Sequence, residues 1–180
     1  MEFSILYAIQ RLHCAPLDSF ILLLTKIAGS YGEMWLVIGA VLLIFKKTRK
    51  CGIAMFLSYG IVYLVGQYGL KDLIARPRPC HIDRTVELLI DRPSSYSCPS
   101  THSAWAFAAA ATVFLNHKKA GIVVCVIAVL IAFSRMYLFV HFPTDVLLGA
   151  VLGVLAALAA AALVRYFAGK LQKKKEAAAE

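Results

Sequence analysis

The sequence predicts an all-α integral membrane protein, a bundle of six transmembrane helices preceded by a short N-terminal amphipathic helix. Of the 180 residues, 61% are hydrophobic and 16% are charged, and the mean hydropathy is +0.74. About half of a soluble domain is apolar and about a quarter is charged, so this composition does not fit a soluble protein. The apolar residues form long runs separated by short basic loops, which is typical of membrane-spanning helices. We expect a single membrane-embedded domain over residues 1–170 and a polar tail over 171–180.

The first half of the chain predicts the amphipathic helix and three membrane helices. Residues 2–14 place apolar side chains at helical spacing, and this segment is expected to lie at the membrane surface. The apolar runs 17–28 and 34–45 flank a turn at 29–32, and we expect two separate helices there. Each run is short for a hydrocarbon core about 30 Å thick, so flanking residues must contribute. Residues 51–70 form a third helix of full spanning length.

The second half predicts three further membrane helices around two polar segments. Residues 71–100 are rich in proline and in charges of both signs, and they form the largest segment outside the membrane. The fourth and fifth helices are expected over 103–115 and 120–136. The sixth begins near Pro143, which suits the first turn of a helix, and continues to about residue 167.

Small residues recur at every fourth position of the sixth helix, at Gly149, Gly153, Ala157 and Ala161. Such a stripe allows close helix packing in a membrane. Asp145 falls on the same line, so its carboxylate is expected to face the interior of the bundle.

The distribution of basic residues predicts the orientation in the plasma membrane. Lysines and arginines gather in the loops 46–50 and 116–119 and in the tail from Arg165. With six helices, all three lie on one side together with the N-terminus, and the positive-inside rule makes that side cytoplasmic. The loops 71–100 and 134–145 then face the exterior or periplasm.

Basic residues are also present on the predicted outer side, where the rule disfavours them. They are Lys71, Arg76, Arg78, Arg84, Arg92 and Arg135. An anionic ligand on that face would explain them, whereas the +9 net charge is a consequence of topology and does not indicate a nucleic-acid partner.

Three clusters on this side carry the candidate chemistry. The segment from Ser134 to Asp145 contains Arg135, His141 and Asp145, and an aspartate at the mouth of a membrane helix needs a partner. His141, four residues earlier, is the nearest candidate, and a carboxylate that orients a histidine can make it nucleophilic. Taken alone, this segment fits helix capping and snorkelling equally well.

The other two clusters add cations and hydrogen-bond donors. Lys71 and Arg78 lie at the end of the third helix, and Ser100, Thr101 and His102 open the fourth. A helix N-terminus offers free N–H groups to a phosphate. Basic residues and hydroxyl residues at helix ends are more often membrane anchors and helix caps. Together with Arg135, however, these two clusters predict a phosphate-binding site.

The predicted catalytic group consists of His141, Asp145 and His102. His141, held by Asp145, would attack phosphorus, and His102 would protonate the leaving oxygen. The cations would stabilise the developing charge, so this chemistry is complete without a metal or cofactor.

These motifs resemble the type 2 phosphatidic acid phosphatase superfamily, whose pattern is Lys-x6-Arg-Pro, Pro-Ser-Gly-His and Ser-Arg-x5-His-x3-Asp. The resemblance implies a metal-independent phosphatase in which His141 forms a phosphohistidine, Asp145 supports it and His102 is the general acid. It assigns phosphate binding to Lys71, Arg78, Ser100, Thr101 and Arg135. Soluble relatives include vanadium haloperoxidases, but the membrane helices argue against that activity here.

One position departs from the family pattern, and one dipeptide duplicates part of it. Thr101 stands where the family has glycine, and its stiff side chain could narrow the pocket or add a hydroxyl donor. Arg76 repeats the Arg-Pro dipeptide at the wrong distance from Lys71, and we treat it as a secondary contact at best. Cys80 and Cys98 bracket the outer segment, and a disulfide between them is a hypothesis.

The resemblance indicates the class of substrate, a lipid phosphate, more firmly than it indicates the exact lipid. The resemblance favours hydrolysis of undecaprenyl diphosphate to undecaprenyl phosphate at the outer face. Phosphatidylglycerophosphate or phosphatidic acid is the alternative substrate, and a lipid phosphotransferase would use the same residues. A non-enzymatic anion transporter could also use a cationic pocket, but such proteins often show two related halves, and we see no internal repeat. The sequence leaves the oligomeric state open.

Overall fold

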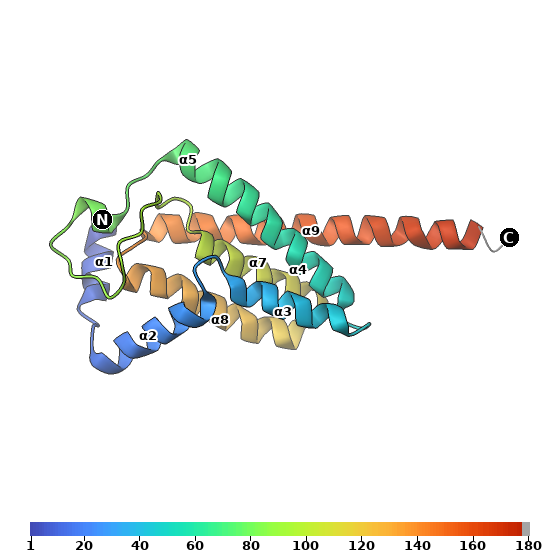
Figure 1. Cartoon of the computed structure of the whole chain (residues 1–180), viewed down its shortest axis with the longest axis horizontal. Helices are drawn as coiled ribbons and strands as arrows, with labels where there is room; N and C mark the ends of the chain where they lie inside the picture. The colour runs from blue at the N-terminus through green and yellow to red at the C-terminus, as the bar shows by residue number, and fades with distance from the viewer. Residues whose placement is uncertain (178–180) are drawn as a thin grey trace.

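The computed structural model describes residues 1–177, apart from the side chain at 175, and the described chain is helical without strands (Figure 1). The elements are α1 (Glu2–Gln10), α2 (Ala15–Ala28), α3 (Glu33–Ile44), α4 (Arg49–Ile61), the π-helix η1 (Val62–Leu70), α5 (Lys71–Ile74), α6 (Pro79–Ile82), α7 (Thr101–Asn116), α8 (Lys118–Tyr137) and α9 (Pro143–Ala177). The predicted all-helical class is therefore confirmed.

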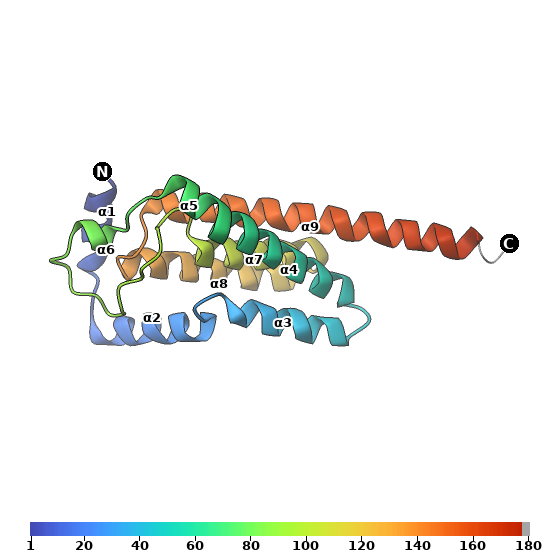
Figure 2. The same ribbon diagram turned by 45° about the horizontal axis from the view of Figure 1, so that its top comes forward.

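The expected count of six membrane helices is not confirmed. Three helical stretches are long and apolar enough to cross a membrane, namely Arg49–Ile82, Lys118–Tyr137 and Pro143–Lys174. Helices α2 and α3 meet at a 53° bend and pass the same test only as a pair, which makes up to four spans. Figure 2 shows α2 and α3 following each other in one direction before α4 returns. The segment between them is thus a bend and not a reversal of the chain.

Two glycines form this bend. Gly29 has φ +78° and Gly32 has φ +71°, a region that residues with a Cβ rarely adopt. Gly32 also lies against the Trp105 ring, where an added Cβ would be in tight contact with the indole. The bend is therefore fixed both by its backbone and by its packing on α7.

The bend changes the predicted position of the N-terminus. Glu2 in α1 hydrogen-bonds Thr144 at the start of α9, whereas α9 then runs for 35 residues to the other end of the bundle. The two ends of the described chain consequently lie at opposite ends of the molecule (Figure 1). The prediction that both termini share one side is therefore not confirmed, because it counted α2 and α3 as two crossings.

Helix α1 packs on the protein and covers residues 2–10, not 2–14. Leu6 and Ile9 are buried, and Phe3 and Tyr7 pack against Phe139. An amphipathic helix lying free at the membrane surface is therefore not confirmed.

The core of the bundle forms where α7 packs between its neighbours. Gly149 and Gly153 of α9 face the carbonyl oxygens of Ser100 and Ala104, and a Cβ at either glycine would overlap those oxygens. The backbones of α7 and α9 are thus in direct contact, as the small-residue stripe predicts. Asp145, one turn before Gly149, is fully buried.

The segment between α5 and α7 folds over the same end of the bundle as α1. Cys80 and Cys98 are buried in it, and within the described chain both are free thiols. The disulfide hypothesis is therefore not supported. At the other end of the chain, α9 continues through the expected domain boundary at residue 170, and residues 178–180 of the predicted tail lie outside the described part.

Candidate active site

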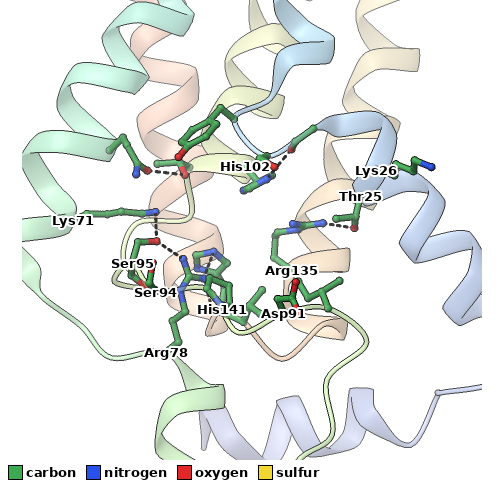
Figure 3. Close-up of a pocket in the computed structure, with 18 residues that line it drawn as sticks. Thr25, Lys26, Lys71, Arg78, Asp91, Ser94, Ser95, His102, Arg135 and His141 are labelled. Atoms are coloured by element: carbon green, nitrogen blue, oxygen red, sulfur yellow. Dashed lines mark hydrogen bonds between the residues drawn. The ribbon is translucent and has the colours of Figure 1, made fainter.

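A cavity of about 540 Å³ opens at the end of the bundle that carries α1 and the polar segment. Six of the eight predicted site residues line it, and they come from all three sequence clusters: Lys71, Arg78, Thr101, His102, Arg135 and His141. Figure 3 shows five of these groups converging from different elements, namely Lys71, Arg78, His102, Arg135 and His141. Ser100 and Asp145 lie behind the lining, and His13, His81 and His117 do not belong to it.

Three cations in this cavity are buried without a carboxylate partner. Lys71, Arg78 and Arg135 keep only 3–4% of their surface exposed. Across residues 1–177 as described, none of the three lies within 4.0 Å of a carboxylate oxygen, although Asp91 also lines the cavity. Buried charges are costly unless they are paired. An anionic ligand entering the cavity would supply the missing charge.

His141 lies between one of these cations and Asp145. Its Nε2 is 3.1 Å from Arg78 Nη1, and its Nδ1 is 3.8 Å from Asp145 Oδ2. Since the guanidinium can only donate, Nε2 must accept, and the proton of the neutral ring lies on Nδ1. His141 is in the loop between α8 and α9, outside the spanning helices. Burial and the positive charges of Arg78 and Lys71 lower its pKa to about 3, although Asp145 opposes this shift, so the imidazole is neutral near neutral pH.

The Asp145 carboxylate is held mainly by groups other than His141. Its Oδ1 accepts a 2.7 Å hydrogen bond from Arg76, and its Oδ2 accepts one of 2.9 Å from the backbone N–H of Phe142. At 3.8 Å, His141 Nδ1 is beyond hydrogen-bond distance, and it has no hydrogen-bond partner in the described structure. Arg76 is therefore a principal contact of Asp145, which its sequence spacing did not indicate.

His102 is positioned by the bend between α2 and α3. It is the second residue of α7, and its Nε2 lies 3.1 Å from the carbonyl oxygen of Gly29. That carbonyl requires the proton to be on Nε2, which leaves Nδ1 free to exchange a proton. The unusual backbone of Gly29 thus determines where this histidine is held.

The two residues before His102 have different roles. Ser100 caps α7, with its Oγ accepting from the N–H and Oγ of Ser103, and it does not reach the cavity. Thr101 lines the cavity, and its Oγ1 donates to Gln67 Oε1 at 3.4 Å. Its methyl group is placed against Gly66 of the π-helix, where an added Cβ would lie 3.5 Å from Thr101 Cγ2. An added Cβ would thus meet Thr101 only at van der Waals distance, and its tight contact would be with Leu152 Cδ2 at 3.0 Å.

Sequence reasoning also missed Ser95 and Thr25. Ser95 accepts hydrogen bonds from Lys71 Nζ at 3.5 Å and Arg78 Nη2 at 3.0 Å through its Oγ, and from Arg78 Nε at 2.7 Å through its carbonyl oxygen. Thr25 of α2 accepts from Arg135 Nη2 (Figure 3). Both residues hold phosphate-binding candidates by hydroxyl groups, and an isolated serine or threonine in a loop or helix gives no sequence signal for this.

Within residues 1–177, no group of three or more histidine, cysteine, aspartate or glutamate side chains is arranged to hold a metal ion.

Comparison with known families identifies the arrangement. Residues 50–168 match the PAP2 superfamily, a stretch that includes all of the predicted site residues. The chain belongs to the PAP2 superfamily. Solved structures agree: the PAP2-type phosphatidylglycerolphosphate phosphatase of Bacillus subtilis superposes with a TM-score of 0.72 at 32% identity, over 93% of this chain and 84% of that one. LpxE of Aquifex aeolicus superposes with a TM-score of 0.70 at 27% identity, over 88% of this chain and 93% of that one.

Two curated relatives of this PAP2 protein are named as phosphatases. An undecaprenyl-diphosphatase of Sulfolobus acidocaldarius is 36% identical over 140 residues, which are 77% of this chain and 66% of that protein. Phosphatidylglycerophosphatase B of Bacillus subtilis is 38% identical over 130 residues, 66% of this chain and 60% of that protein. This chain thus covers slightly less than two thirds of each relative. The resemblance seen in the motifs is confirmed, and the protein is a membrane protein of this superfamily.

Proposed function

We propose that this PAP2 protein is a membrane lipid phosphatase that converts undecaprenyl diphosphate to undecaprenyl phosphate. The observation that carries the proposal is the cavity itself, in which three buried, unpaired cations surround two histidines. A phosphate group carries about −1.5 to −2 charges, which matches these cations. The name of the Sulfolobus relative supports undecaprenyl diphosphate as the substrate.

The proposed chemistry begins with attack by His141. Its Nε2 lone pair forms a bond to phosphorus while the bond from phosphorus to the leaving oxygen breaks. Arg78, already 3.1 Å from Nε2, would hold a phosphate oxygen beside the nucleophile. Lys71 and Arg135 would stabilise the charge on the other phosphate oxygens in a buried, low-dielectric site.

His102 would complete both half-reactions. In the first, His102 acts as the imidazolium: its Nδ1 gives a proton to the leaving lipid phosphate, while its Nε2–H stays hydrogen-bonded to the carbonyl oxygen of Gly29. In the second, a water attacks the phosphohistidine, the bond between phosphorus and nitrogen breaks, and His102 takes up the proton of that water. The products are inorganic phosphate, the shortened lipid phosphate and the original state of both histidines.

We also propose that the cavity faces outward. The basic loop between α3 and α4, the loop between α7 and α8 and the basic end of α9 gather at the end of the bundle away from the cavity (Figure 1). The positive-inside rule places that end in the cytoplasm. The cavity and the N-terminus would then lie on the exterior or periplasmic side.

A glycerolipid phosphate is the second candidate substrate. The Bacillus subtilis structure that superposes on 93% of this chain is a phosphatidylglycerolphosphate phosphatase, which favours this alternative. A phosphotransferase would use the same phosphohistidine but pass the phosphate to another lipid. An anion transporter would need the cations but not both histidines.

The test is phosphate release by purified protein in detergent with EDTA present. Undecaprenyl diphosphate, phosphatidylglycerophosphate and phosphatidic acid are compared in parallel, with His141→Ala as the inactive control. We expect EDTA-resistant release that is fastest for undecaprenyl diphosphate and lost in the variant. Turnover retained by His141→Ala would overturn the phosphohistidine route, and a different ranking would reassign the substrate.

A further inference from the structure

Arg76 and Glu2 form a charged chain that reaches the site from outside the cavity. Arg76 donates from Nη1 to Asp145 Oδ1 at 2.7 Å and from Nη2 to Glu2 Oε2 at 2.5 Å. Glu2 Oε1 in turn accepts from the hydroxyl and the N–H of Thr144, the neighbour of Asp145. The N-terminal helix is thereby connected to the carboxylate that supports His141.

The contacts of Arg76 fix its position closely. Its guanidinium carbon lies 4.0 Å above the centre of the Phe142 ring, and its carbonyl oxygen accepts from the N–H of Ser97 at 2.9 Å. Its side chain is 27% exposed, whereas Asp145 is 0% exposed. An arginine with its backbone and both ends of its guanidinium engaged is suited to orient a carboxylate.

The two carboxylate oxygens of Asp145 face different partners. Oδ1 is held by Arg76, which leaves Oδ2 turned toward Phe142 N–H and His141 Nδ1. At 3.8 Å, His141 Nδ1 is the unpartnered member of this group. The position and charge of the carboxylate seen by His141 therefore depend on how strongly Arg76 holds it.

We propose that Arg76 is a positioning residue that shares Asp145 with His141, and that Glu2 controls how strongly it does so. This inference rests on the proposed phosphohistidine chemistry and deepens it. A cation beside Asp145 reduces the negative potential at His141, and the Glu2 carboxylate weakens that cation in turn. The N-terminal helix then adjusts a nucleophile that it does not touch.

Other charged groups face the same pair and stay constant in the test. Arg78, Lys71, His102 and Arg135 surround His141, and the thiol of Cys98 lies against Asp145. All of these groups are present in the Arg76 and Glu2 variants. A change in the pH profile of a variant is therefore caused by the loss of the Glu2–Arg76 interaction.

The proposal predicts shifts of opposite sign in two variants. In Arg76→Gln, Asp145 regains its full charge toward His141, which favours the imidazolium. The acidic limb of the kcat/KM profile should then move to higher pH by about one unit. In Glu2→Gln, Arg76 is drawn more strongly to Asp145, and the limb should move to lower pH. The double variant should match Arg76→Gln, because Glu2 acts through Arg76.

Two further variants separate charge from geometry and from general surface effects. Arg76→Lys keeps the charge but cannot bridge two carboxylates, so the limb should stay near that of the wild type while kcat falls about tenfold. Arg84→Gln removes an exposed arginine from the same polar segment and should leave the profile unchanged. Ionisation of the substrate is common to all variants and cancels in the comparison.

The experiment is the pH dependence of phosphate release by each variant, together with a 15N titration of the His141 imidazole in substrate-free protein. The His141 signal is assigned by its loss in His141→Asn. Opposite shifts in Arg76→Gln and Glu2→Gln support the proposal. Shifts in one direction, or lower activity without any shift, would reduce Arg76 to a structural contact. If the wild type releases no phosphate, the proposed function fails, and the 15N titration still decides the role of Arg76.

Discussion

His141 and His102 line the same cavity, but they are supported by different kinds of contact. His141 lies among charged side chains, with Arg78 at one nitrogen and Asp145 at the other. His102 instead hydrogen-bonds a backbone carbonyl presented by the glycine bend between α2 and α3. The first histidine is therefore tuned by charge and the second by backbone position, so substitutions around them should have different signatures.

The largest effect should come from the charged side. Asp145→Asn keeps the size of the side chain but removes its charge and presents an amide to His141. We expect kcat/KM to fall by about 10³–10⁴, the scale seen when a histidine loses its orienting carboxylate. The loss should be similar for an undecaprenyl diphosphate and for an aryl phosphate, because Asp145 supports the nucleophile that attacks both substrates and does not act on the leaving group. A loss confined to one substrate would contradict this.

The contribution of His102 should depend on the leaving group. In His102→Asn, hydrolysis of a lipid phosphate should fall by about 10²–10⁴, the usual contribution of a general acid. An aryl phosphate such as 4-nitrophenyl phosphate releases a stable phenolate and needs little protonation, so its loss should be at least tenfold smaller. Equal losses on both substrates would show that His102 binds phosphate and does not act as an acid.

Gly29→Ala should reproduce the His102 signature in weaker form. The φ of +78° strains any residue with a Cβ, and that Cβ would also overlap the Glu33 carboxylate. We expect the displaced carbonyl to lower lipid phosphate hydrolysis about tenfold and aryl phosphate hydrolysis less. Gly169→Ala, where an added Cβ meets nothing within 4 Å, is the matched control. Kinetics on both substrates and thermal unfolding in detergent measure the effect.

Burial of a neutral His141 should also make stability depend on pH. Its pKa is about 3 in the folded protein and near 6.5 when the chain is unfolded. Between these values the unfolded state binds more protons, so stability is lost as the pH falls below 6.5 and levels off near 3. We expect the Tm of His141→Asn to fall less than that of the wild type, by about 10 °C over this window. Parallel curves for the two proteins would contradict a neutral, buried His141.

The smallest effect should concern the choice of lipid. Thr101→Gly removes the hydroxyl that donates to Gln67 and the methyl group that fills the space beside Gly66. We expect a shift of about threefold in kcat/KM toward the bulkier glycerolipid phosphate, since a lost methyl group in a pocket changes discrimination modestly. Thr101→Ser keeps the hydroxyl but loses the same methyl group, so it should show the shift as well if the methyl group is its cause. An unchanged preference in the glycine variant would show that Thr101 has no part in selection.

The cavity could be predicted because its residues are spaced by rigid helices. Lys71 and Arg78 end one helix, Thr101 and His102 begin another, and His141 follows a third. Residues at helix ends can be assigned to the same end of the bundle from the helix boundaries alone, without knowledge of the detailed packing. The burial of Asp145 could also be predicted, because Asp145 lies on the small-residue stripe that marks the face of α9 in contact with α7.

Two features could not be read from the sequence. The Gly29–Gly32 turn fits a bend as well as a reversal, because the apolar runs on either side carry no information on direction. Arg76 was set aside because its spacing from Lys71 differs from that of Arg78, the arginine predicted to bind phosphate. Arg76 instead pairs with Asp145. The two residues are far apart in the sequence, so only the folded structure shows that they are in contact.

The contact between α7 and α9 has a consequence for how a lipid enters. Backbone touches backbone at Gly149 and Gly153, so these two helices cannot separate without losing close packing along two turns. His102 and Asp145 are carried on this rigid pair. Widening of the cavity is therefore expected from the opposite wall, where the α2–α3 bend and the π-helix present Tyr31 and Gln67. The acyl or prenyl chain of the proposed substrate is expected to enter on the side that gives way, while the chemical groups stay in register.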